Sequence, residues 1–143
     1  LEECTIIIFG ATGDLSKRKL LPAMYKLIDD NTICKFAIIG ISRDNSSPQS
    51  LIQNAKPFIN KATEKTLAVL EQNLHYFQMD FHDTVAYNKL KKMIEDIEQK
   101  YNLPGNRLFY LATMPDHFVD ITTYLSLNKI AHPTTPKAIH GIE

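Results

Sequence analysis

Two glycines, Gly10 and Gly13, follow directly on the apolar run at residues 5–9 and could bring the main chain against a phosphate. A buried strand that ends in glycines can turn sharply into a helix, and backbone N–H groups then approach a pyrophosphate. The positive end of the following helix attracts the same anion. The spacing alone is weak evidence, because glycines also end strands for conformational reasons and Ser16 replaces the third glycine of such motifs. The turn predicts a site for a dinucleotide, or for a ligand of similar shape.

Arg43 follows the second apolar run and would decide which coenzyme fits. At this point of a dinucleotide site, an acidic side chain accepts hydrogen bonds from the ribose 2′-hydroxyl, whereas an arginine accommodates a 2′-phosphate. The planar guanidinium suits a phosphate better than a lysine would, so we expect NADP. Asp44 leaves NAD open, because its carboxylate could point at a ribose. Both residues could also be solvated loop charges.

Short β-rich runs alternate with segments of helical period, and this order predicts consecutive βαβ units under right-handed crossovers. We expect parallel strands at residues 4–9, 34–41, 74–79 and 107–112. The predicted fold class is therefore α/β, a doubly wound parallel-sheet Rossmann-like domain.

The helices between these strands differ in how clearly the sequence marks them. The clearest covers residues 83–101, with Asp83 able to cap its start, and a last helix is expected at residues 116–129. Pro22 either kinks the first helix or marks the start of its regular part. Residues 50–73 suggest two shorter helices. Residues 131–143 show no firm pattern, and their prolines suggest a connecting loop.

Composition limits the function classes open to the chain. Its 143 residues are 44% hydrophobic and 22% charged, which suits one domain over residues 1–143. Sixteen Lys and Arg balance sixteen Asp and Glu, so no overall field would draw the protein to nucleic acid or to an anionic membrane. No apolar stretch approaches the ~20 residues that cross a bilayer, and we expect a cytoplasmic protein. Histidines and cysteines show no metal-ligand spacing, and Cys4 and Cys34 are expected to be reduced thiols.

Two stretches of the chain resemble one enzyme family. Residues 9–25 are similar to the N-terminal signature of the glucose-6-phosphate dehydrogenases, in which Gly-Ala-Ser/Thr-Gly-Asp-Leu-Ala/Ser-Lys-Arg-Lys follows the first strand. Residues 107–118 resemble the family's Asn-Arg-Leu-Phe-Tyr-Leu-Ala-Leu-Pro-Pro segment, although Met114 replaces its first proline. Arg43 takes the place of the family's arginine for the 2′-phosphate.

The resemblance implies a set of coenzyme-binding residues. The phosphate loop and first helix turn would supply most of them, and the loop after the fourth strand would lie near the nicotinamide half. The set is Gly10, Ala11, Thr12, Gly13, Asp14, Leu15, Ser16, Lys17, Arg43, Ala112, Met114 and Phe118. Lys17, Arg18 and Lys19 could touch phosphates, but a cluster of charges on a helix surface explains Arg18 and Lys19 equally well.

The same resemblance implies an activity for the parent protein. Members of the family oxidise glucose 6-phosphate to 6-phosphogluconolactone in the pentose phosphate pathway, with hydride transfer to NADP, and the parent is expected to be a homo-oligomer. The family's general-base histidine belongs to an Arg-Ile-Asp-His-Tyr-Leu-Gly-Lys run that this chain lacks. We therefore expect the catalytic residues to lie outside this chain, which would be the truncated coenzyme domain and inactive alone. The alternative is a freestanding, non-catalytic Rossmann-like module that senses NADP.

Overall fold

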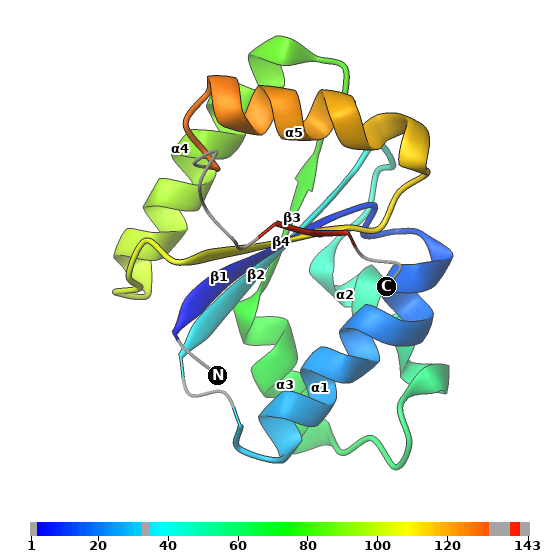
Figure 1. Cartoon of the computed structure of the whole chain (residues 1–143). Helices are drawn as coiled ribbons and strands as arrows, with labels where there is room; N and C mark the ends of the chain where they lie inside the picture. Colours follow the sequence, from blue (N-terminus) through cyan, green and yellow to red (C-terminus); the bar gives the residue numbers. More distant parts are fainter. Residues whose placement is uncertain (1–2, 33–34, 132–137, 141–143) are drawn as a thin grey trace.

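The computed structural model describes residues 3–32, 35–131 and 138–140, and its core is a five-stranded parallel sheet (Figure 1). The strand order is β3-β2-β1-β4-β5. The strands are β1 (Cys4–Phe9), β2 (Phe36–Ser42), β3 (Leu74–Gln78), β4 (Arg107–Leu111) and β5 (Ala138–His140). Because the chain moves outward from β1 to β3 and then returns to the other side of β1, the order reverses between β1 and β4. Such a switch point is where open α/β sheets bind ligands.

Helices cover both faces of this sheet, as the doubly wound prediction requires (Figure 1). One face packs Ile6 and Ile8 of β1 against α1, α2 and α3, and the other packs Ile7 and Phe9 against α4 and α5. The helical segments are η1 (Ser16–Leu20), α1 (Leu21–Asp29), α2 (Pro48–Ala55), η2 (Lys56–Phe58), α3 (Glu64–Asn73), α4 (Thr84–Lys100), η3 (Pro115–His117) and α5 (Phe118–Leu127). All six residues of β1 are buried, which explains why this strand is apolar apart from Thr5.

Local signals placed most helices within a few residues. Asp83 caps α4 as predicted, accepting hydrogen bonds from the backbone of Val85 and Ala86 at 3.2 and 3.3 Å. The regular part of the first helix begins at Leu21, with Pro22 in its first turn, after the π-helical turn η1. The last helix is shorter than expected, because the 3₁₀ turn η3 precedes α5.

The expectation of a connecting loop at the end of the chain is wrong for β5. This strand pairs in parallel with β4, with Phe109 opposite Ala138 and Leu111 opposite His140. A strand of three residues is too short to show a period in the sequence. Its position is defined by its pairing with β4. Cys34 lies outside the described residues, and the prediction of reduced thiols stays a prediction.

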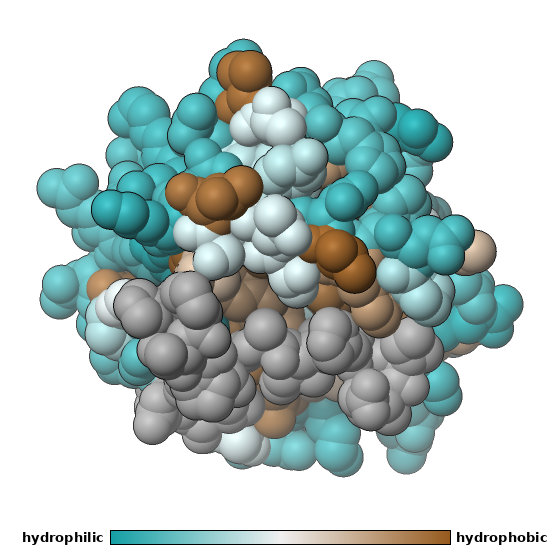
Figure 2. Space-filling view, turned by 45° about the horizontal axis from the view of Figure 1, so that its top comes forward, coloured by the Kyte–Doolittle hydropathy of each residue, from teal (hydrophilic) through white to brown (hydrophobic). Residues whose placement is uncertain are grey.

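The surface over α5 carries separate hydrophobic side chains. Figure 2 shows brown patches divided by white and teal residues. The exposed hydrophobic residues include Val119 and Leu127 of α5, and Val85 at the start of α4. Hydrophobic residues scattered singly over a surface are normal. Within the ranges that the structure describes, no helix is long and apolar enough to cross a membrane.

An ion pair with little solvent exposure joins α4 and β4, and its arginine also bonds the segment after α5. Arg107 donates two hydrogen bonds of 2.8 Å to the Glu98 carboxylate and one of 2.9 Å to the Ile130 carbonyl. The two side chains are only 15% and 12% exposed, so removing one charge leaves the other poorly solvated. We expect Glu98→Gln to lower the free energy of unfolding by about 2 kcal/mol, measured by urea denaturation.

An exposed pair on the same helix provides the control. Lys92 and Asp96 lie 3.2 Å apart with side chains 78% and 62% exposed. Asp96→Asn should cost no more than about 0.5 kcal/mol, because solvent screens exposed pairs. Equal losses in the two variants would contradict the structural role given to Arg107 and Glu98.

Candidate functional site

The turn after β1 is held between the two neighbouring strands. The N–H groups of Gly10 and Ala11 donate to the Ile41 carbonyl at 2.8 and 3.0 Å, and Ala112 donates to the Phe9 carbonyl at 2.8 Å. Gly10 has φ +94°, and a Cβ added there would lie 2.4 Å from the Ala112 carbonyl oxygen. Only glycine fits this conformation and this space. The main chain of this turn can therefore pass closely between β2 and β4, where the strand order reverses.

Gly13 closes the turn and starts the helix. Its N–H donates to the Gly10 carbonyl at 3.0 Å, and its own carbonyl accepts from Lys17 at 3.3 Å. The helical segment starts at Asp14 and continues through η1 into α1. The first turn of this helix thus lies directly beside the glycine loop, the arrangement in which backbone N–H groups and the helix dipole favour an anion.

A cavity of about 570 Å³ lies at the carboxyl ends of the strands and contains most of the predicted site residues. Among those predicted, the residues that line it are Gly10, Thr12, Gly13, Asp14, Leu15, Arg43, Ala112 and Met114. The other predicted residues do not line it. They are Ala11 and Ser16, both buried, Lys17, whose ammonium lies 3.9 Å from Asp14, and Phe118, which packs against the core of the α4 and α5 face.

Residues that follow β3 also line the cavity, and the sequence analysis missed them. Asp80, Phe81 and His82 form this wall, and Thr113, Pro115 and His117 contribute from the segment after β4. One signal was available for the first three: they follow the third predicted strand, whose carboxyl end must lie at the same edge of a parallel sheet.

Ring contacts and a polar contact between side chains fix this wall. The Phe81 ring meets Phe9 at 5.7 Å and His117 at 5.6 Å in edge-on geometry, and the rings of His82 and His117 are 5.4 Å apart. His82 Nδ1 lies 3.1 Å from the Asp120 carboxylate. The segment after β3 is therefore connected to η3 and α5 across the cavity.

The turn that carries Arg43 is fixed from β3. Gln78 donates from its amide to the Arg43 carbonyl at 3.1 Å. The Tyr76 hydroxyl donates to the Asp44 carbonyl and also contacts Ser42 Oγ. Burial raises the pKa of Tyr76, so its hydroxyl stays protonated and keeps donating. The main chain of this turn is thus positioned, while the Arg43 side chain remains 82% exposed.

Two carboxylates line the cavity together with Arg43. Asp44 accepts a 2.6 Å hydrogen bond from the Thr12 hydroxyl, which joins this turn to the glycine loop. Asp80 has one carboxylate oxygen 3.9 Å from the Arg43 guanidinium. Its other oxygen accepts from the His82 N–H at 2.9 Å.

The Arg18 side chain contacts other residues on the helix surface, as expected if it belongs to a cluster of surface charges. Its Nε lies 2.7 Å from Asp14, and its guanidinium lies 4.6 Å from the centre of the Phe58 ring. Within the described ranges, no group of three His, Cys, Asp or Glu side chains is arranged to hold a metal ion.

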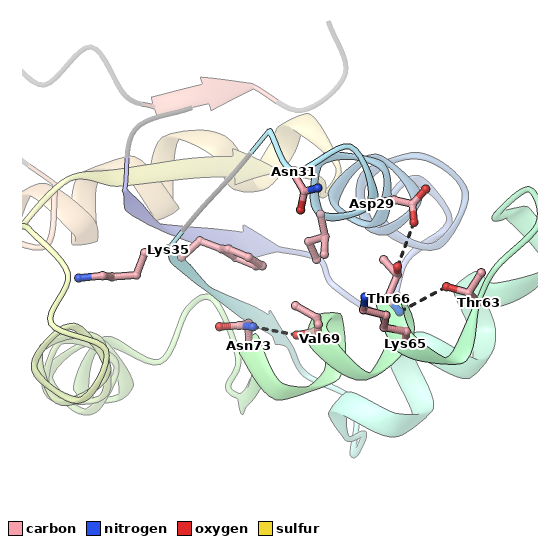
Figure 3. A pocket seen from close by; sticks show the side chains of 10 residues that line it. Asp29, Asn31, Lys35, Thr63, Lys65, Thr66, Val69 and Asn73 are labelled. Carbon is pink, nitrogen blue, oxygen red and sulfur yellow. Dashed lines mark hydrogen bonds between the residues drawn. The ribbon is translucent and has the colours of Figure 1, made fainter.

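A second cavity, of about 460 Å³, lies at the amino end of β2, between the carboxyl end of α1 and the length of α3 (Figure 3). Thr66 of α3 donates to the Asp29 carboxylate of α1 at 2.9 Å, and Asn73 donates to the Val69 carbonyl within α3 at 2.8 Å. The bond between Thr66 and Asp29 connects the two helices, and we assign the cavity no ligand.

Comparisons with known proteins agree on one family. A sequence model described as "Glucose-6-phosphate dehydrogenase, NAD binding domain" matches residues 7–139. Glucose-6-phosphate 1-dehydrogenase of Chlamydia muridarum is 35% identical over 89% of this chain and 26% of that protein. The Kluyveromyces lactis enzyme of the same name is 37% identical over 89% of this chain and 27% of its own length. A solved structure of glucose-6-phosphate dehydrogenase in complex with glucose-6-phosphate matches 97% of this chain and 29% of its own, with TM-score 0.81 and 32% identity.

The parallel sheet, the glycine turn and the cavity at the switch point define a Rossmann-like α/β domain. The match over residues 7–139 shows that the chain belongs to the family of glucose-6-phosphate dehydrogenase NAD-binding domains. It spans about a quarter of the length of the curated relatives that it matches.

Proposed function

We propose that this chain is the coenzyme-binding domain of a glucose-6-phosphate dehydrogenase and that its 570 Å³ cavity binds NADP. The observation that carries the proposal is the Gly10 turn, where no Cβ fits and the main chain borders the cavity. The chain's own residues suit the coenzyme, because a glycine loop and a helix start meet a fully ionised arginine at the same rim.

Each part of the cavity has a role in this proposal. The loop from Gly10 to Gly13 and the helix start bind the pyrophosphate, and Arg43 binds the 2′-phosphate. The main chain of Ala112 and the side chain of Met114 lie along the nicotinamide half. When bound, NADP supplies the acceptor for a hydride. The domain orients it and keeps its reactive end at the β4 side of the sheet.

The parent protein, in this proposal, oxidises glucose 6-phosphate to 6-phosphogluconolactone in the pentose phosphate pathway. Support comes from relatives named glucose-6-phosphate 1-dehydrogenase and from the solved relative that holds glucose-6-phosphate. These relatives are longer than this chain, which supports a division of roles between domains. In that division, the rest of the parent protein supplies the substrate site, the catalytic residues and the contacts of a homo-oligomer. A cytoplasmic location stays a prediction from composition. These relatives favour the dehydrogenase over a freestanding NADP sensor.

Arg43→Ala tests the assignment of the 2′-phosphate. A hydrogen bond to a charged group contributes about 1.5–3 kcal/mol, so we expect NADP affinity to fall by ~10- to 100-fold while NAD affinity barely changes. Titration calorimetry with both coenzymes measures the two effects.

Arg18→Ala is the matched control. It removes an arginine of the same helix-and-loop region whose guanidinium is already paired with Asp14, and neither affinity should change. Equal losses of NADP and NAD affinity in Arg43→Ala would show that Arg43 contacts something other than the 2′-phosphate.

A further inference from the structure

The charge around Arg43 does not favour an additional phosphate. Asp44 and Asp80 both line the cavity together with this arginine, so one guanidinium and two carboxylates share its rim. A 2′-phosphate would be attracted by the guanidinium and repelled by the two carboxylates. The ribose of NAD adds no charge at this place, and the Asp44 carboxylate can accept a hydrogen bond from one of its hydroxyls.

We propose that Asp80 is a specificity-determining residue that weakens binding of the 2′-phosphate, so that the domain accepts NAD as well as NADP. The inference rests on the proposed coenzyme site and adds the reason for its selectivity. Asp80 is placed for this role by its 3.9 Å approach to the Arg43 guanidinium.

Binding NADP would have two electrostatic costs that NAD avoids. Arg43 must turn from Asp80 to the phosphate, and the phosphate must remain near the Asp80 carboxylate. Both side chains are exposed, 82% for Arg43 and 44% for Asp80, so each cost is modest. Together these two costs offset much of the binding free energy that the 2′-phosphate gains from the guanidinium. We therefore expect the NADP and NAD dissociation constants to lie within about tenfold of each other.

Asp80→Asn separates charge from local structure. One Asp80 oxygen accepts from the His82 N–H, and an asparagine Oδ1 can keep that bond while the oxygen facing Arg43 loses its charge. NADP should bind about three- to tenfold more tightly and NAD unchanged, by titration calorimetry of the 143-residue chain. The gain should shrink between about 0.1 M and about 1 M salt, because salt screens exposed charges.

Asp96→Asn removes the same charge from α4, on an exposed pair that lies outside the cavity, and should change neither affinity. If both coenzymes bind and Asp80→Asn leaves NADP unchanged or tightens NAD equally, the role of Asp80 is wrong and the coenzyme site stands. A preference for NADP above about a hundredfold in the unmodified chain would also overturn it. Binding of neither coenzyme would overturn the proposed function together with this inference.

Discussion

Replacing Gly10 with alanine is expected to destabilise this domain strongly. The new Cβ would lie 2.4 Å from the Ala112 carbonyl oxygen and 2.9 Å from its carbon, and φ at this residue is +94°. The neighbouring main chain cannot easily move away, because Ala112 also donates to Phe9. Strain in this region and overlap with backbone together should remove at least ~3 kcal/mol of a total that is typically 5–15 kcal/mol. Urea denaturation followed by circular dichroism measures the loss.

Gly13→Ala is the matched variant in the same loop. Its Cβ would lie 3.3 Å from the Gly10 carbonyl oxygen, a tight contact that a small shift relieves. We expect a folded protein with little or no affinity for NADP, because Gly13 lines the cavity where the pyrophosphate would approach. If the two variants lose stability equally, the close approach of the turn to β4 does not explain the need for Gly10.

Much of the fold could be predicted because its signals are local. The apolar run of β1 and the glycines after it stand next to each other in the sequence, and α4 shows both a helical period and a capping aspartate at Asp83. The strand β5 gave no such signal. It is three residues long, and only its pairing with β4, far away in the sequence, defines it.

The cavity was predicted in part for the same reason. The glycine loop and Arg43 each carry a local motif, whereas the wall after β3 is defined by contacts between distant segments. Phe81 meets Phe9 and His82 meets Asp120, and no spacing along the chain indicates either contact. Thr12 and Asp44 likewise meet across the loop, although each was considered separately from the sequence.

The 143-residue chain is expected to reduce no NADP or NAD when glucose 6-phosphate is added. The sequence lacks the run that holds the general-base histidine in the family it resembles, and positioned proton transfer contributes roughly 10²–10⁴-fold. Without residues that hold the sugar phosphate, the substrate also loses the orientation on which hydride transfer depends. Absorbance of the reduced nicotinamide, in protein free of host dehydrogenase, measures the rate against a control without protein.

Substitution of His82 can test directly whether this domain contains a general base. Its imidazole lines the cavity and pairs with Asp120 at 3.1 Å, and a carboxylate that orients a histidine is a common arrangement for a general base. His82→Asn, assayed beside the unmodified chain, separates the possibilities. Sustained reduction that disappears in this variant would place the general base within this domain and contradict the division between coenzyme domain and catalytic domain. No reduction in either protein, with NADP binding retained in both, leaves His82 the structural role of connecting the segment after β3 to α5.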